Sequence, residues 1–101
     1  MTAAEWLRGR MEDAPPALLD TMLAALPSDA ALPLPDALAE GALALYARLP
    51  ETGGRADALP LLAADALFTH ALEAQAEADP DGVGALAERI GAAGALGGLA
   101  A

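Results

Sequence analysis

The sequence contains no cysteine and no lysine, and it has a single valine and a single isoleucine, Val83 and Ile90. Without cysteine the chain has no disulfide, no thiolate nucleophile and no cysteine-ligated metal, and this composition favours a cytoplasmic location. Trp6, Tyr46 and Phe68 are the only aromatic residues. Because strands favour β-branched and aromatic side chains, their scarcity argues against a β-sheet.

Positive charge is also scarce, since five arginines stand against fifteen acidic residues and the formal net charge is −10. A negative field repels phosphate groups, so we expect neither nucleic acid nor an anionic membrane surface as a partner. No apolar stretch follows the first arginines, which argues against a secretory signal. No run approaches the roughly 20 apolar residues of a membrane span. The charge favours solubility or a basic partner.

Alanine and leucine supply most of the apolar content, with 29 and 19 residues in a chain of 101. These are among the strongest helix formers. Proline and glycine divide the chain into segments of helical length joined by short connections. The composition and spacing predict an all-α fold, a small bundle of about five helices that forms a single domain over residues 1–101.

The first two helices have recognisable starts. Thr2 and Glu5 have the spacing of a capping box, which predicts a short helix through about Met11. Asp13 precedes two prolines, and an acidic cap followed by early proline predicts the start of a second helix. Pro27 ends that helix. Apolar residues recur at helical spacing within it, at Leu18, Leu19, Met22, Leu23 and Leu26.

A proline-rich loop is expected over residues 27–35, and Pro35 with Asp36 opens a third helix that ends before Pro50. The intervals between its apolar residues are those of one helix face. The predicted inner face consists of Leu38, Ala42, Leu45 and Leu49.

Asp57 is the expected cap of the fourth and longest helix, with Pro60 in its first turn. Its predicted apolar side is Leu61, Ala64, Asp65, Phe68, Ala71 and Leu72. A turn with a new cap is expected over 79–82. The fifth helix is carried by Val83, Leu86, Ala87 and Ile90, and a glycine- and alanine-rich tail follows over 91–101, where each helical glycine costs about 1 kcal/mol relative to alanine.

His70 is the only histidine, and it is a candidate buried polar residue. Positions three and four apart project together from a helix, so His70, Glu73 and Glu77 offer a metal or acid/base site in one interpretation. In the other interpretation His70 is a half-exposed helix residue without chemistry. We favour the second, because one histidine with two surface acids is a poor ligand set.

Asp65 interrupts an apolar face and is the second candidate buried polar residue. A buried acid without a partner costs several kcal/mol, so Asp65 is expected to be paired or near the surface. Arg48, Arg55 or Arg89 is the expected internal partner. The alternatives are a bound Mg²⁺ or an arginine of another chain.

The remaining polar residues form no catalytic pattern. Asp79 and Asp81 resemble the start of a calcium loop, but the other ligand positions are missing, so capping is the better interpretation. No serine, histidine and acid set has triad character, and no lysine is present for a phosphate loop. We therefore expect no enzyme activity, no cofactor and no metal.

The C-terminal half resembles a piece of the trans-isoprenyl diphosphate synthase (polyprenyl synthetase) family, over roughly 62–99. The resemblance rests on the segment 62–67, LAADAL, and on the glycine-rich segment 90–98, IGAAGALGG. Both aspartate-rich motifs that hold Mg²⁺ in that family are missing, and the family's glycine and glutamine positions are Ala64 and Leu99. The resemblance implies a degenerate helical relative, an accessory subunit without diphosphate chemistry.

The apolar residues suggest a protein interface. Trp6, Met11 and Met22 are either core or a contact surface. The apolar end of the chain adds four candidates, because small residues allow helices to approach closely; these candidates are Ile90, Gly94, Leu96 and Leu99. We expect a non-catalytic protein that associates with another chain, as an accessory or assembly subunit or as a homo-oligomer. The alternatives are a binding module for a prenyl or acyl chain and a subunit that contributes to a heteromeric enzyme.

Overall fold

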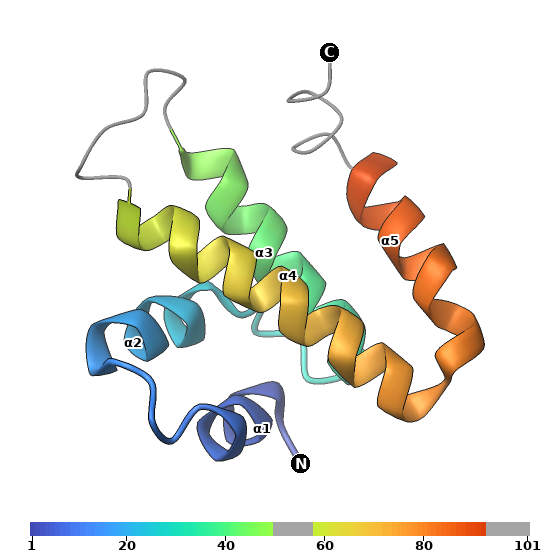
Figure 1. Ribbon diagram of the computed structural model, residues 1–101, viewed down its shortest axis with the longest axis horizontal. Coiled ribbons are helices and arrows are strands. Elements are labelled where there is room, and N and C mark those ends of the chain that lie inside the picture. Colours follow the sequence, from blue (N-terminus) through green and yellow to red (C-terminus); the bar gives the residue numbers. More distant parts are fainter. Residues whose placement is uncertain (50–57, 93–101) are drawn as a thin grey trace.

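In the computed structural model, residues 1–49 and 58–92 are described, and within these ranges every regular element is helical (Figure 1). The elements are α1 (Ala3–Arg10), α2 (Pro16–Ala25), α3 (Leu34–Arg48), α4 (Ala58–Ala78), the short 3₁₀ turn η2 (Pro80–Gly82) and α5 (Val83–Ala92). The prediction of a small all-α bundle with five α-helices is confirmed. The predicted cap Asp57 and the end of the chain beyond Ala92 lie outside the described residues.

Helices α3 and α4 form the centre of the fold. They lie side by side and antiparallel, with α1 and α2 on one side and α5 on the other (Figure 1). Among the residues that the structure describes, eight of the fifteen buried hydrophobic residues are alanine, and side chains this small allow two helix axes to lie close together. Six larger side chains are fully buried around this contact: Leu7, Met22, Leu38, Leu67, Leu86 and Ile90. Small and large apolar side chains therefore form one hydrophobic cluster.

The start of α1 is as predicted, whereas the predicted cap of α2 is wrong. Thr2 occupies the N-cap of α1, and its hydroxyl oxygen accepts a hydrogen bond of 3.1 Å from the Glu5 amide. Helix α2 begins at Pro16, and its N-cap is Pro15 rather than Asp13. The Pro15 carbonyl oxygen accepts hydrogen bonds from the Leu18 and Leu19 amides. Two consecutive prolines set the helical backbone angle without a side-chain cap, because proline has no amide to satisfy.

Helix α3 begins within two residues of its predicted start, with Pro33 as its N-cap and Asp36 in its first turn.

The turn after α4 also forms as predicted. There the Asp79 side chain accepts a hydrogen bond of 3.2 Å from the Asp81 amide and caps η2. This hydrogen bond supports the capping interpretation of Asp79 over the calcium interpretation.

The predicted inner face of α4 is wrong in part. Ala64 and Ala71 are buried as expected, but Leu61 is 44% exposed. The buried stripe is rotated toward smaller residues and consists of Ala63, Ala64, Leu67, Ala71 and Ala74. The physical reason is that α4 turns four alanines and Leu67 toward the centre, so Leu61 lies outside the buried stripe.

Glycine in α5 provides a test of local stability. Gly84 is exposed inside the helix, and a Cβ atom at this position would meet no atom within 4 Å. We expect Gly84→Ala to raise the free energy of unfolding by about 0.5–1 kcal/mol, because alanine loses less backbone entropy on folding. Urea denaturation followed by circular dichroism measures the change. An unchanged or lowered midpoint would show that α5 is not helical at Gly84.

Candidate functional site

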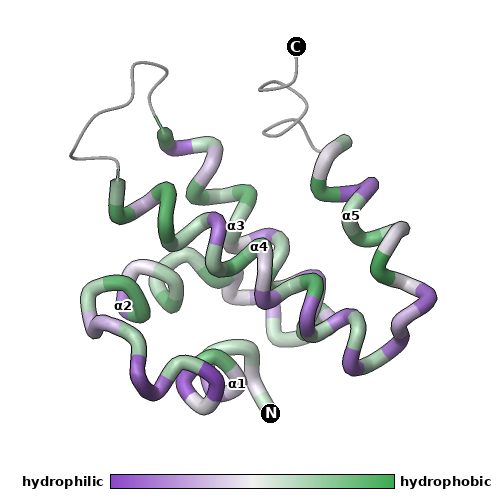
Figure 2. The backbone as a smooth tube through the Cα atoms, viewed as in Figure 1, coloured by the Kyte–Doolittle hydropathy of each residue, from purple (hydrophilic) through white to green (hydrophobic). Residues whose placement is uncertain are grey.

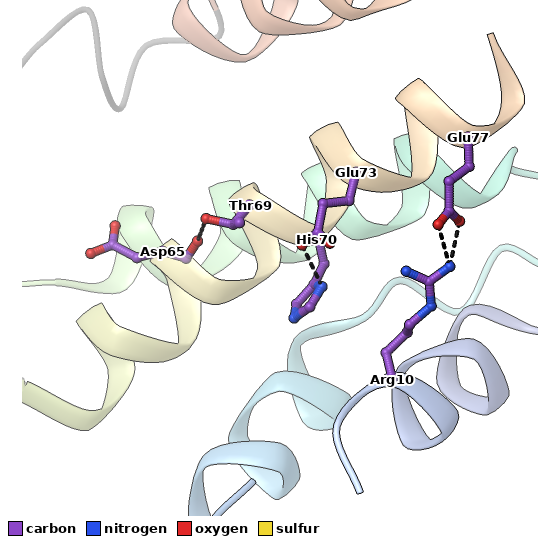
Figure 3. A network of polar contacts seen from close by, with 6 residues as sticks. All are labelled: Arg10, Asp65, Thr69, His70, Glu73 and Glu77. Carbon is purple, nitrogen blue, oxygen red and sulfur yellow. Dashed lines mark hydrogen bonds and ion pairs between the residues drawn. The ribbon is translucent and has the colours of Figure 1, made fainter. Parts of the chain in front are cut away.

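Side chains of α1 and α4 form an aromatic and ionic cluster, although the backbones of these two helices are not in contact. The Trp6 ring meets the His70 ring edge-on, with centroids 5.9 Å apart and an interplanar angle of 79°. The Arg10 guanidinium lies 4.5 Å from the centre of the Trp6 ring. Arg10 also donates to both carboxylate oxygens of Glu77 (Figure 3). Edge-on aromatic and cation–π contacts of this kind stabilise the docking of α1.

The ion pair with Glu77 stabilises the charged form of Arg10. The hydrogen bond to Glu77 raises the pKa of Arg10 above its usual value, against an opposing effect of desolvation. The negative charges of Glu77 and Glu73 act in the same direction as the hydrogen bond. Arg10 is therefore positively charged in the folded protein, and both carboxylate oxygens of Glu77 accept hydrogen bonds from it.

His70 is half-buried, with 19% of its side chain exposed. Its Nδ1 atom is buried and lies 3.0 Å from Glu73 Oε1, but this contact lacks hydrogen-bond geometry, and Nδ1 has no other partner in the described part of the chain. Because Glu77 turns to Arg10, the three side chains do not converge (Figure 3). Among the described residues no group of three histidine or acidic side chains is placed to hold a metal ion. The arrangement favours a structural role for His70, as part of the packing of Trp6.

Asp65 is exposed and paired, which confirms the expectation that it is paired or near the surface, whereas its prediction as a buried residue is wrong. Its partner is also different from the arginines expected, because the Tyr46 hydroxyl of α3 donates a hydrogen bond to Asp65 Oδ1. The Thr69 hydroxyl donates to the Asp65 carbonyl at 3.0 Å (Figure 3). Tyr46 directly follows Leu45 of the inner face of α3, and its hydroxyl reaches Asp65 on α4 from there. The pair joins the two central helices at the surface.

The environment of Tyr46 changes its acidity. Burial of the phenol, followed by its hydrogen bond to Asp65 and the negative charge of Asp65, raises the pKa of Tyr46 from 10.0 to about 12. All three effects disfavour the phenolate. The folded protein therefore holds the Tyr46 proton more tightly than the unfolded chain does.

Alkaline titration should show this difference directly, because Tyr46 is the only tyrosine. We expect its phenolate absorbance to appear near pH 12, and the Tyr46 pKa to fall in Asp65→Asn while staying above 10.0, since burial remains. The stability that the raised pKa contributes is complete below pH 10.0 and is lost as the pH rises toward about 12. A Tyr46 titration midpoint at pH 10.0 in the unaltered folded protein would contradict the burial of the phenol and its hydrogen bond to Asp65.

Three large aliphatic side chains at the beginning of α4 remain in contact with solvent. Leu59, Leu61 and Leu62 are 38%, 44% and 56% exposed, and Figure 2 shows this end of α4 as a hydrophobic stretch. We call these three residues the leucine surface. The sequence assigned Leu61 to the core and did not single out the other two. Single exposed leucines are common, but neighbouring ones on one helix are typical of contact surfaces.

The predicted interface residues divide into three groups. Met22 and Ile90 are buried in the core of this chain, so their assignment to an interface is wrong and the core alternative holds for Met22. Trp6 and Met11 are half-buried and pack against the core. The predicted candidates Gly94, Leu96 and Leu99 lie outside the described residues.

Cavities on the described surface include two with aliphatic side chains in their lining. One has a volume of about 370 Å³ and lies between the first four residues of the chain and the connection from α2 to α3. Its lining includes Leu23, Leu26, Leu32 and Leu34. The other has a volume of about 230 Å³ and lies between α3 and α5. We call the second cavity the α3–α5 groove.

No described helix is both long enough and apolar enough to span a membrane. Comparisons with family models, with curated proteins and with solved structures gave no match to this chain. The resemblance of its C-terminal half to the polyprenyl synthetase family stays a prediction.

Proposed function

We propose that this chain acts by associating with another protein, and that the leucine surface at the start of α4 is a contact site. The observation that carries the proposal is the exposure of Leu59, Leu61 and Leu62, whereas every other leucine that the structure describes is buried or half-buried. Transfer of apolar surface from water into an interface contributes about 25 cal/mol per Å² before the costs of association. Three neighbouring leucines therefore supply a favourable anchor.

The partner that fits best carries an aliphatic face with basic side chains around it. The net charge of −10 makes a second copy of this chain a poor partner, since like charges repel on approach. A basic protein is attracted by the same charge, and the attraction speeds its encounter. The lack of cysteine fits a reducing compartment, and we place the association in the cytoplasm.

The test compares the unaltered chain with Leu61→Glu/Leu62→Glu as bait in an extract of the source cells. We expect a stoichiometric partner on the unaltered chain, confirmed by light scattering of the reconstituted complex, and at least tenfold weaker binding by the double variant, about 1.4 kcal/mol. The matched control is Ala76→Glu/Ala87→Glu, which adds the same charge at two exposed alanines and should leave binding intact. Equal binding by both variants, or a self-associating chain, would contradict the proposal.

A second candidate function is the binding of a prenyl or acyl chain. The observation that favours it is the cavity of about 370 Å³ with its aliphatic lining, which is within the size range of small-molecule sites. Native mass spectrometry of the purified protein tests it, because a bound lipid adds a defined mass.

A related proposal is that this chain is a subunit of a heteromeric polyprenyl synthase. It predicts no Mg²⁺-dependent turnover of an allylic diphosphate by this chain alone.

A further inference from the structure

The floor of the α3–α5 groove is aliphatic. Ala39 and Leu43 come from α3, and Leu86 and Ile90 come from α5. Leu43 is half-buried and borders solvent, whereas the other three are nearly covered. A volume of about 230 Å³ exceeds the roughly 150 Å³ of an apolar cavity that accepts a benzene molecule. The groove is large enough for one leucine or phenylalanine side chain of a partner.

The rim of the groove carries charge. Asp36 and Glu40 are one helical turn apart on α3, and Arg89 stands on α5. The Arg89 guanidinium donates a hydrogen bond of 3.0 Å to Asp36 Oδ1 and so crosses from α5 to α3. Glu40 is exposed and makes no ion pair with any residue that the structure describes. The rim therefore carries one excess negative charge beside an apolar floor.

From this combination we infer that the α3–α5 groove binds an amphipathic helix of a partner protein. That helix carries a leucine or phenylalanine and, one helical turn away, an arginine or lysine. The apolar side chain enters the groove, and the cation pairs with Glu40 and competes with Arg89 for Asp36. Helices bind in apolar grooves through anchors with this spacing. The inference rests on the proposed function only in taking the partner to be a protein, since the groove lies apart from the leucine surface.

The experiment uses two labelled helical peptides of about 15 residues, a length at which helices begin to be stable. Both carry one leucine stripe, flanked by arginine in the first and by glutamate in the second. We expect the arginine peptide to shift the backbone amide resonances of Asp36, Glu40, Leu43 and Ile90 in nuclear magnetic resonance spectra of the whole chain. The glutamate peptide should leave these resonances in place.

Variants of the groove sharpen the test. Leu43→Gln should weaken binding of the arginine peptide at least tenfold, and Glu40→Arg, at an exposed position, should do so without touching the core. Arg89→Ala should tighten binding about twofold to fivefold at low salt, because it removes the competing cation, and salt should reduce this gain. The control Glu88→Gln removes an exposed acid of α5 outside the groove and should change binding less than twofold.

Three results would overturn the inference: equal binding of both peptides, weaker binding by Arg89→Ala, or no shift at the groove. The bait experiment with Leu61→Glu/Leu62→Glu is independent of all three. If the chain binds its partner through the leucine surface but does not bind the arginine peptide, the groove inference is contradicted and the proposed function is not.

Discussion

Replacing Leu67 by alanine is expected to lower the free energy of unfolding by about 2–5 kcal/mol. Leu67 is fully buried near the middle of α4 and belongs to the main hydrophobic cluster. Alanine keeps the helix propensity of this position, so the loss comes from the missing apolar contacts and from the cavity left behind. Because small domains have total stabilities of about 5–15 kcal/mol, this loss is a large fraction of the whole.

Urea denaturation measures this loss, and thermal unfolding gives a second measurement. For a domain near this size, each kcal/mol lowers the Tm by about 4–8 °C. The matched control is Leu62→Ala, the same exchange on the same helix at a side chain that is 56% exposed. We expect a change within about 0.5 kcal/mol for this control. Similar effects of the two variants would mean that α4 does not present Leu67 to the core.

The contrast between α4 and α5 shows what the sequence could specify. In α5 two large apolar residues, Leu86 and Ile90, are four positions apart, and the charged residues Glu88 and Arg89 lie between them. The pattern has one apolar side, and of its predicted residues Leu86 and Ile90 are buried and Val83 is half-buried, whereas the prediction for Ala87, which is exposed, is wrong. In α4 leucine and alanine occur on every side, so the pattern does not fix which side is inward. The large residues were assigned inward, and this choice put Leu61 on the wrong side.

The aromatic and ionic cluster could not be predicted for a different reason. Its members come from α1 and α4, and it forms only where Arg10 reaches Glu77, 67 positions along the chain, across helices whose backbones do not touch. The sequence identified Trp6 and His70 as residues of interest, but it gave no sign that they would meet each other. The pairing of Tyr46 with Asp65 has the same origin, since it depends on the register of α3 against α4.

The close approach of α3 and α4 also accounts for the exposed leucines. A helix whose inner stripe is mostly alanine buries little apolar area per residue, and the leucines outside that stripe then face sideways or outward. Leu59, Leu61 and Leu62 are therefore a consequence of how α4 uses its small face. The same helix stabilises the fold with one side and offers an apolar surface with the other, which links the packing of this domain to its proposed association.

Gly41→Val tests that close approach, and we expect it to lower the free energy of unfolding by about 1–3 kcal/mol. A Cβ atom at Gly41 would lie 3.2 Å from Leu67 Cδ1 and 3.4 Å from the Ala25 carbonyl oxygen. The two further methyl groups of valine extend into the same space. The control Gly84→Val makes the identical exchange where no atom lies within 4 Å of the new Cβ. It should be neutral or slightly stabilising, because valine is a better helix former than glycine.

A double-mutant cycle separates crowding from other effects of the valine. In a Leu67→Ala background the nearest obstacle is gone, so Gly41→Val should cost less than it does alone, with a coupling of about 0.5–3 kcal/mol. The backbone carbonyl of Ala25 stays in place and leaves part of the cost. Additive effects would show that Gly41 and Leu67 do not meet. The central contact between α2, α3 and α4 would then differ from the one that leaves the leucine surface exposed.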